Sequence, residues 1–279
     1  MDRRKFLLAA FALGLAGSAP VAAMAAPPFA PTRFSVQLRG TGPDVILIPG
    51  LTSGSEVWRG TVAAVPGYRY HLLHVAGFAG APARGNARGA VVAPLADEIA
   101  RYIRDRGLER PAIVGHSMGG TVAMMIAARH PDLAGRIMVV DMLPQPAGLF
   151  GSSSSGPLAN SLRNWISTPS GRRLVGGLLE AFSPPEMSNA RSDPDVVAQA
   201  MHELSSTDLG PQLGRIRAPL TVVYASPDPQ ARASIDRSFA AGFAPARGAR
   251  LVRIDDSGHM VMLDQPARFQ AELRAFLRR

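Results

Sequence analysis

The sequence predicts a single α/β domain in which helices cover both faces of a mostly parallel β-sheet. Across the 279 residues, short runs of β-branched and aliphatic residues alternate with longer stretches of helical periodicity. Crossover connections between parallel strands produce this alternation. One long interval without a strand pattern interrupts it, and one Gly-x-Ser-x-Gly turn joins a buried run directly to a helical pattern. We therefore expect one sheet, one inserted segment and a serine raised above the sheet.

Residues 1–25 have the pattern of an export signal that is removed from the mature protein. A basic start that includes Arg3-Arg4 precedes the apolar residues 6–15, and residues 23–25 form a small-x-small cleavage site. The basic start resembles the twin-arginine export motif of bacteria, and the general secretory route is the alternative. The apolar stretch is too short to span a membrane comfortably. We therefore expect an exported, periplasmic protein with no stable membrane insertion after cleavage.

Short runs that follow a proline-rich linker over residues 26–33 are predicted to be β-strands. The first run alternates as an edge strand does, and the others follow at the spacing of βα units. In order they are Phe34–Leu38, Val45–Ile48, Tyr70–Val75, Ala112–Val114, Ile137–Val140, Leu220–Tyr224 and Leu251–Ile254. Helical periodicity is found at Ala90–Arg106, Thr121–Arg129 and Asp264–Arg278.

The interval over residues 144–215 contains no strand pattern and is predicted to be an inserted helical lid. Turns rich in glycine, serine and proline separate its amphipathic pieces, which are Leu158–Ile166, Gly171–Phe182 and Asp193–Leu204. Ligands of open α/β sheets bind at the carboxyl edge of the strands, and the apolar side chains of this interval need a surface to cover. The core is therefore expected over residues 34–143 and 216–279, with the lid over the carboxyl edge of the sheet.

The composition excludes several kinds of chemistry. The chain has no cysteine, so disulfides, thiolate metal sites and cysteine nucleophiles are excluded together. The formal net charge is +9 and Lys5 is the only lysine. No basic helix face or run of interleaved aromatic residues follows the N-terminal segment. We therefore expect a diffuse basic surface and no nucleic-acid partner.

The run Gly115-His116-Ser117-Met118-Gly119 is the strongest sign of chemistry. It joins a buried strand directly to a helix, so the serine hydroxyl is raised above the sheet on a sharp turn. Gly115 and Gly119 are expected to be small because strand and helix approach too closely there for side chains. The start of the helix adds partial positive charge and free N–H groups beside the serine. Ser117 is therefore the candidate nucleophile.

Four features together resemble the α/β-hydrolase superfamily. They are Ser117 in its turn, Pro49-Gly50-Leu51 after an early strand, Trp58, and Gly258-His259 before the last helix. The subgroup that the chain resembles is often labelled pimeloyl-carrier-protein methyl ester carboxylesterase, and it carries a helical cap. Family members usually have His-Gly where this chain has Pro49-Gly50. The resemblance implies that the next backbone N–H, that of Leu51, is an oxyanion donor.

His259 is the candidate base among six histidines. It follows the last predicted strand through a short loop, which places it near Ser117, and it completes the chain order Ser, Asp, His of this architecture. His116 adjoins the serine, but neighbours on a tight turn point apart, so a packing role is expected. Structural roles are also expected of His71, His74, His130 and His202.

Two aspartates that end strands between Ser117 and His259 compete to orient the base. Asp228 is preferred, because it follows the run Leu220–Tyr224 and matches the loop in which the family usually keeps its acid. Asp141 follows Ile137–Val140, a position that some family members use, and it is the alternative acid. Its other possible role is to fix the loop that leads into the lid through hydrogen bonds to backbone N–H groups.

These residues predict acyl transfer. His259 takes the proton of Ser117, the alkoxide attacks an ester carbonyl, and the N–H groups of Leu51 and Met118 hold the oxyanion. No metal or organic cofactor is required. The predicted function is that of a carboxylesterase, a hydrolase that cleaves a small to medium, uncharged ester through an acyl-enzyme. A lactonase, a perhydrolase, a carbon–carbon bond hydrolase, an acyltransferase or a weakly catalytic ligand receptor would use the same constellation.

Overall fold

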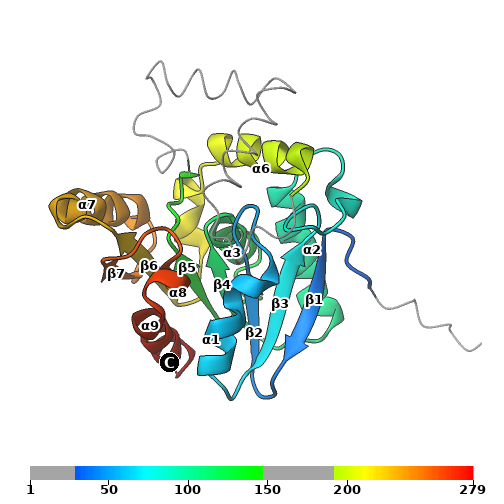
Figure 1. The fold of residues 1–279 in the computed structure, drawn as a ribbon, viewed down its shortest axis with the longest axis horizontal. Helices are drawn as coiled ribbons and strands as arrows, with labels where there is room; N and C mark the ends of the chain where they lie inside the picture. Colours follow the sequence, from blue (N-terminus) through cyan, green and yellow to red (C-terminus); the bar gives the residue numbers. More distant parts are fainter. Residues whose placement is uncertain (1–28, 147–191, 279) are drawn as a thin grey trace, which may run out of the picture.

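A seven-stranded sheet forms the centre of the computed structural model, which describes residues 29–146 and 192–278 (Figure 1). The strands are β1 (Phe34–Arg39), β2 (Asp44–Ile48), β3 (Arg69–Val75), β4 (Ala112–His116), β5 (Arg136–Val140), β6 (Leu220–Ser226) and β7 (Arg250–Asp255). Their order is β1-β3-β2-β4-β5-β6-β7, with β1 antiparallel to β3 and the other neighbours parallel. The fold class predicted from the sequence is confirmed.

Helices cover both faces of this sheet. The helices are α1 (Arg59–Ala64), α2 (Val92–Asp105), α3 (Met118–Arg129), α6 (Pro194–Ser206), α7 (Arg232–Phe243), α8 (Val261–Asp264) and α9 (Pro266–Arg278). Short 3-10 helices are η1 (Ser55–Trp58), η2 (Arg84–Asn86), η4 (Gly210–Arg215) and η5 (Pro229–Ala231). Helices α2 and α3 pack on one face, and α1 and α9 pack on the other.

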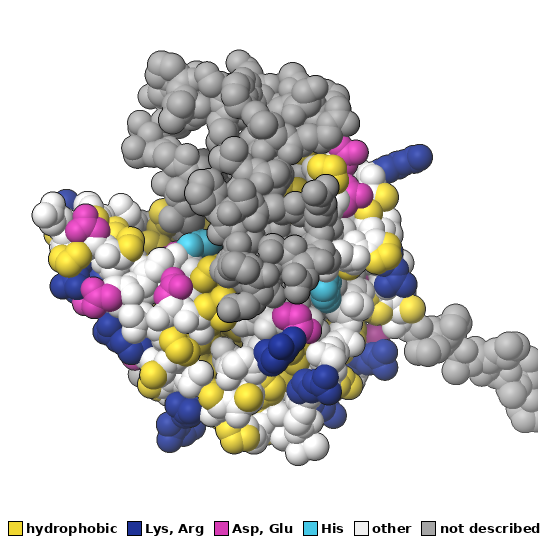
Figure 2. Space-filling model, in the orientation of Figure 1, with side chains coloured by type: hydrophobic (Ala, Val, Ile, Leu, Met, Phe, Trp, Pro, Cys, Tyr) yellow, Lys and Arg dark blue, Asp and Glu magenta, His cyan; other side chains and the backbone are white. Residues whose placement is uncertain are grey.

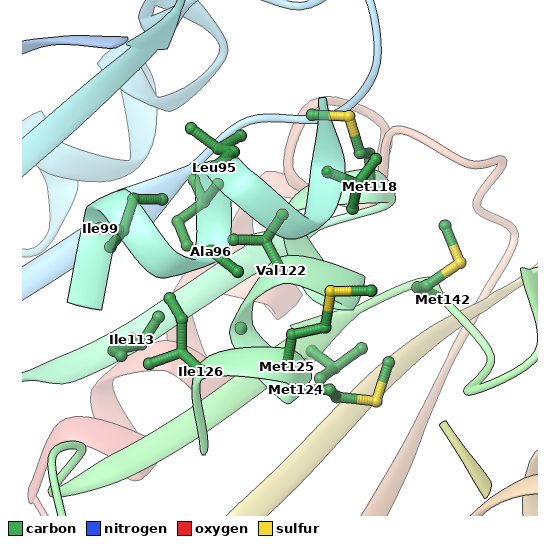
Figure 3. Packing of buried hydrophobic residues seen from close by; sticks show 14 of the residues in the cluster. Leu95, Ala96, Ile99, Ile113, Met118, Val122, Met124, Met125, Ile126 and Met142 are labelled. Atoms are coloured by element: carbon green, nitrogen blue, oxygen red, sulfur yellow. The ribbon is translucent and has the colours of Figure 1, made fainter. Parts of the chain in front are cut away.

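The core has two halves, one on each face of the sheet. Successive side chains of a strand point to opposite faces, so Ile46 and Ile48 of β2 enter one half and Val45 and Leu47 enter the other. Helix α3 is buried along almost its whole length. In the first half, α2 packs on α3 through side chains that include Leu95, Ala96, Ile99, Val122 and Ile126 (Figure 3). This packing fixes α3 and with it the turn that precedes the helix.

The chain between β5 and β6 returns to the core through α6. Asp193 caps this helix, since its side chain accepts hydrogen bonds from the N–H groups of Asp195 and Val196 at 3.0 and 3.1 Å. The predicted helical piece Asp193–Leu204 corresponds to α6. The other two predicted pieces, residues 158–166 and 171–182, lie outside the described residues, as does the export signal over residues 1–25.

Arginines on the visible surface are scattered among acidic, polar and apolar side chains (Figure 2). Several arginines of the described residues pair with carboxylates, as Arg129 does with Asp97 at 2.8 Å. Exposed pairs of this kind contribute little to stability. In the described ranges, no helix combines the length and the apolar character needed to cross a membrane.

Candidate active site

Ser117 lies on the turn between β4 and α3 with a strained backbone. Its φ and ψ angles are 52° and −122°, which lie in a region that costs a non-glycine residue of order 1–3 kcal/mol. Neighbouring atoms hold the turn, because the Ser117 N–H donates to the Val140 carbonyl at 2.9 Å and the Gly120 N–H donates to the Ser117 carbonyl at 2.7 Å. Strain that is held in this way is typical of functional sites.

Two glycines make the turn possible. A Cβ atom on Gly115 would lie 2.0 Å from the carbonyl oxygen of Gly119. A Cβ atom on Gly119 would lie 2.4 Å from the carbonyl oxygen of Ile48. The obstructing atoms belong to the backbone, so they cannot move aside as a flexible side chain would. The expectation that both positions must be small because strand and helix approach closely is confirmed.

His259 is hydrogen-bonded to Asp141. The distance from His259 Nδ1 to Asp141 Oδ2 is 2.7 Å, and the second carboxylate oxygen accepts the Ala225 N–H at 2.9 Å. The Asp141 side chain is 10% exposed and that of His259 is 49% exposed. A carboxylate only accepts hydrogen bonds, so Nδ1 carries a proton and, in the neutral imidazole, Nε2 is left with its lone pair. This is the tautomer that a general base requires.

Asp228 does not form the expected hydrogen bond with His259 in the described part of the chain. Its carboxylate accepts the backbone N–H of Gln230 at 2.8 Å and caps the 3-10 helix η5. Pro229 lacks an N–H and begins this helix, and Asp228 is exposed. The preferred pairing of His259 with Asp228 is therefore corrected to a pairing with Asp141, the alternative.

The segment Pro49-Gly50-Leu51 lies against the serine turn. It follows β2, the neighbour of β4 in the sheet, and a Cβ atom on Gly50 would lie 3.1 Å from Ser117 Cβ. The hydroxyl of Thr52, whose φ is 59°, donates to the Leu51 carbonyl at 2.7 Å. Met118, the first residue of α3, adjoins Ser117 in the chain. The two expected oxyanion donors, Leu51 and Met118, thus belong to two segments that adjoin the serine, one in space and one in the chain.

His116 contacts the loop of His259, which the sequence pattern does not predict. Its Nε2 lies 2.9 Å from the carbonyl oxygen of His259, and the two ring centroids are 4.7 Å apart. Burial, assisted by the neighbouring His259, lowers the pKa of His116 to about 3, so the ring is neutral near pH 7. The sequence pattern predicts only a packing role, because this contact depends on how a loop distant in the chain folds back.

The loop that carries His259 is fixed at its start by polar contacts. Asp255 lies 2.6 Å from Arg253 Nε and 3.3 Å from Arg232 Nε, and the Arg253 guanidinium lowers the pKa of this carboxyl. The Asp256 N–H donates to the carbonyl of Ser226 at 2.9 Å. The loop therefore leaves β7 beside the end of β6 and brings His259 back to the ends of β4 and β5.

The other histidines occupy the structural positions expected of them. His71 is buried, with Nε2 2.8 Å from Asp44 Oδ1 and Nδ1 2.7 Å from the Tyr102 hydroxyl. The remaining three lie in β3, at the end of α3 and in α6, and are His74, His130 and His202. Within the part of the chain that the structure describes, no three acidic or histidine side chains are grouped as the ligands of a metal ion would be.

Comparison with known proteins defines the class to which this fold and site belong. Residues 45–272 match the model of the Alpha/beta hydrolase family. The chain belongs to this family, as its sequence motifs indicate.

A pimeloyl-[acyl-carrier protein] methyl ester esterase from Aromatoleum aromaticum is 26% identical over 250 residues, which cover 80% of this chain and 94% of the relative. The enol-lactonase from Burkholderia xenovorans LB400 superposes with a TM-score of 0.69 at 18% identity, covering 88% of this chain and 96% of the lactonase. A thermophilic esterase from Thermogutta terrifontis gives 0.69 at 20% identity, with 88% and 93% coverage. At these identities the two structures show the fold alone.

Proposed function

We propose that this chain is a serine hydrolase that cleaves a small to medium, uncharged carboxylic ester through an acyl-enzyme. The observation that carries the proposal is the 2.7 Å contact between His259 and Asp141 beside the strained turn of Ser117. A serine hydroxyl is a weak nucleophile until an oriented base can take its proton. The esterase name of the Aromatoleum relative supports the same chemistry.

The acylation step uses each of these side chains. The Asp141 carboxylate holds the Nδ1–H of His259, so that Nε2 accepts the proton of Ser117 Oγ as the oxygen attacks the ester carbonyl. The oxyanion is held by the N–H groups of Leu51 and Met118, each worth ~10²–10³-fold in rate. Because α3 begins at Met118, the positive end of the helix adds to this stabilisation.

The second half of the cycle releases the acyl group. The imidazolium of His259 first gives its proton to the departing alcohol, and the C–O bond of the ester breaks. The neutral imidazole then takes a proton from water as the water oxygen attacks the carbonyl of the acyl-enzyme. The imidazolium returns this proton to Ser117 Oγ as the bond between Oγ and the acyl carbon breaks, which releases the carboxylic acid and restores the Ser117 hydroxyl. General acid–base catalysis of this kind contributes ~10²–10⁴-fold.

We infer that residues 144–215 form a lid over this site and select the substrate. The segment is inserted between β5 and β6, and Asp141 directly follows β5. The Asp193 N–H, just before α6, donates to the carbonyl of Gly77 in the loop after β3 at 2.7 Å, so the start of α6 lies at the carboxyl edge of the sheet. Its many apolar side chains favour an uncharged, moderately hydrophobic acyl group.

An ester series tests the proposal. We expect Ser117-dependent hydrolysis of p-nitrophenyl esters between acetyl and dodecanoyl, with one range of acyl lengths preferred. The Ser117→Ala variant is the matched control, because it removes only the hydroxyl. Turnover that persists in Ser117→Ala contradicts the mechanism. Absence of turnover with every ester in the wild type would favour a different acyl acceptor or a ligand-binding role.

A further inference from the structure

The imidazole of His116 holds the main chain of His259. The His116 Nε2 lies 2.9 Å from the His259 carbonyl oxygen. A carbonyl oxygen only accepts hydrogen bonds, so Nε2 carries the proton and donates it. The rings of the two residues also lie together, with centroids 4.7 Å apart and planes inclined by 48°. One side chain therefore fixes the backbone of the proposed base and lies against its ring.

The other nitrogen of His116 has no such partner. Nδ1 is buried and accepts no hydrogen bond from any described residue. A buried, unsatisfied lone pair costs free energy that an apolar side chain of similar size would avoid. Packing alone therefore does not account for an imidazole at this position. The donation from Nε2 to His259 is what the imidazole provides and an apolar side chain would not.

The same ring also lies against the segment that precedes Leu51. A Cβ atom on Gly50 would lie 2.8 Å from His116 Nδ1 and 3.1 Å from Ser117 Cβ. His116 thus stands between Gly50 and the loop of His259, and it adjoins Ser117 in the chain. The proposed nucleophile, base and oxyanion segment are all in contact with or bonded to this one residue.

We propose that His116 is a positioning residue that sets the distance and orientation of His259 relative to Ser117. This inference rests on the proposed function, because it takes His259 to be the base. His116 does not exchange a proton with substrate in this role. As a neutral ring, it lies beside the imidazolium that forms on His259 without adding a second positive charge.

The test compares His116→Leu, which removes the donor, with His116→Gln, whose amide N–H can replace it. The kcat of the leucine variant should be lower by ~10–10²-fold, because displacement of the base slows the reaction even when all reacting groups are present. KM should stay within about twofold, since no contact with substrate is lost. The glutamine variant should restore most of the kcat. His71→Leu, which removes a buried imidazole from another part of the sheet, is the matched control for lost stability.

A second readout does not depend on turnover. Hydrogen exchange of the amides over residues 256–260 should become faster in His116→Leu and return toward the wild-type rate in His116→Gln. Wild-type kcat and loop exchange in His116→Leu would overturn the inference, as would an equal loss of kcat per folded molecule in His71→Leu. If the wild type shows no Ser117-dependent turnover, the proposed function fails, and the loop exchange alone decides whether His116 positions His259.

Discussion

The Asp141 carboxylate is oriented by two hydrogen bonds, one to His259 Nδ1 and one to the Ala225 N–H. The backbone at Asp141 has a φ of 49°, and its N–H donates to the Val223 carbonyl at 2.7 Å. The side chain is therefore held at the end of β5, next to β4, the strand that Ser117 directly follows. A carboxylate fixed in this way can keep one imidazole tautomer throughout a catalytic cycle.

Replacement of each aspartate by asparagine tests this assignment. We expect Asp141→Asn to lower kcat by ~10³–10⁴-fold, because an amide can favour the wrong tautomer of His259. Asp228→Asn should have little effect, since Asp228 caps η5 and asparagine is also a good cap. Steady-state kinetics with one p-nitrophenyl ester measures both variants. The reverse ranking in two folded variants would return the role to Asp228.

The sequence predicted that Ser117 lies on a turn between a strand and a helix and that His259 is close to an aspartate, and the structure agrees with both placements. It did not identify which aspartate contacts His259. Asp141 and Asp228 both follow strands, so chain order and spacing do not distinguish between them. Their hydrogen bonds separate them: Asp141 accepts from the Ala225 N–H and contacts His259, whereas Asp228 accepts from the Gln230 N–H and caps η5. The contact between His116 and His259 was hidden for a similar reason, since it joins residues distant in the chain.

The Glu203 carboxylate on α6 binds the start of α2. Glu203 accepts the backbone N–H groups of Val91, Val92 and Ala93, with distances of 2.8 and 2.9 Å for the last two. The first N–H groups of a helix have no partner within it, and negative charge at this end is favourable. The last part of the inserted segment is therefore attached to the core by a charged side chain as well as by apolar packing.

Removal of this side chain should weaken the attachment. We expect Glu203→Ala to lower the free energy of unfolding by ~1–3 kcal/mol, because three N–H groups lose their acceptor together. Urea unfolding measures the change, and Glu109→Ala, at an exposed glutamate, serves as the control. Equal midpoints for the two variants would show that α6 is held without Glu203.

Every predicted strand is present, and α2 lies where the 3/4 spacing of its apolar residues places it. Helix α3 ends at the predicted residue but begins at Met118, three residues before the predicted start, and it is buried on all sides. Helix α7 was not predicted, because only Phe239 and Phe243 of its residues are buried and its apolar pattern is correspondingly weak. Continuous helix from Asp264 was also expected, but Pro266 begins a separate helix, α9, after the short α8. Where a helix packs and where it ends depends on residues that are distant in the chain, and a local sequence pattern does not include them.

Two buried imidazoles make the free energy of unfolding of the protein depend on pH. Burial is the main cause of the lowered pKa of both His116, to about 3, and His71. Between about pH 6.5 and the folded-state pKa, the unfolded chain binds protons that the folded chain does not. The free energy of unfolding should therefore fall as the pH is lowered from about 6.5, by up to ~1.4 kcal/mol per pH unit for each histidine.

Urea unfolding at pH 7 and at pH 4.5 measures this dependence. In His116→Gln, which has no titrating group at this position, the loss of stability between the two pH values should be smaller than in the wild type. The comparison uses the change with pH, so a constant effect of the substitution on packing cancels. An identical loss in both proteins would show that His116 is not the source.

The proposed role of residues 1–25 as an export signal can be tested in the full-length protein. Glu98 accepts the N–H groups of Thr32 and Arg33, so the attachment of the chain to the core includes residues just beyond the expected cleavage site. We propose a periplasmic protein. Replacing Arg3 and Arg4 by lysine keeps the charge but removes the guanidinium groups. Twin-arginine export should then fail, whereas general secretion should tolerate the change. Full-length wild type that stays in the cytoplasm would contradict both routes.

We expect a serine-reactive fluorophosphonate to label Ser117, because His259 activates this residue as a nucleophile in the proposed mechanism. The reagent reacts much faster with an activated serine than with an ordinary hydroxyl group, so the test needs no knowledge of the natural substrate. Mass spectrometry of the labelled, folded protein should find one adduct, on Ser117, and none in Ser117→Ala. His259→Ala should slow the labelling strongly while the fold is kept. Labelling that persists in Ser117→Ala, or that proceeds at the wild-type rate without His259, would contradict the claim.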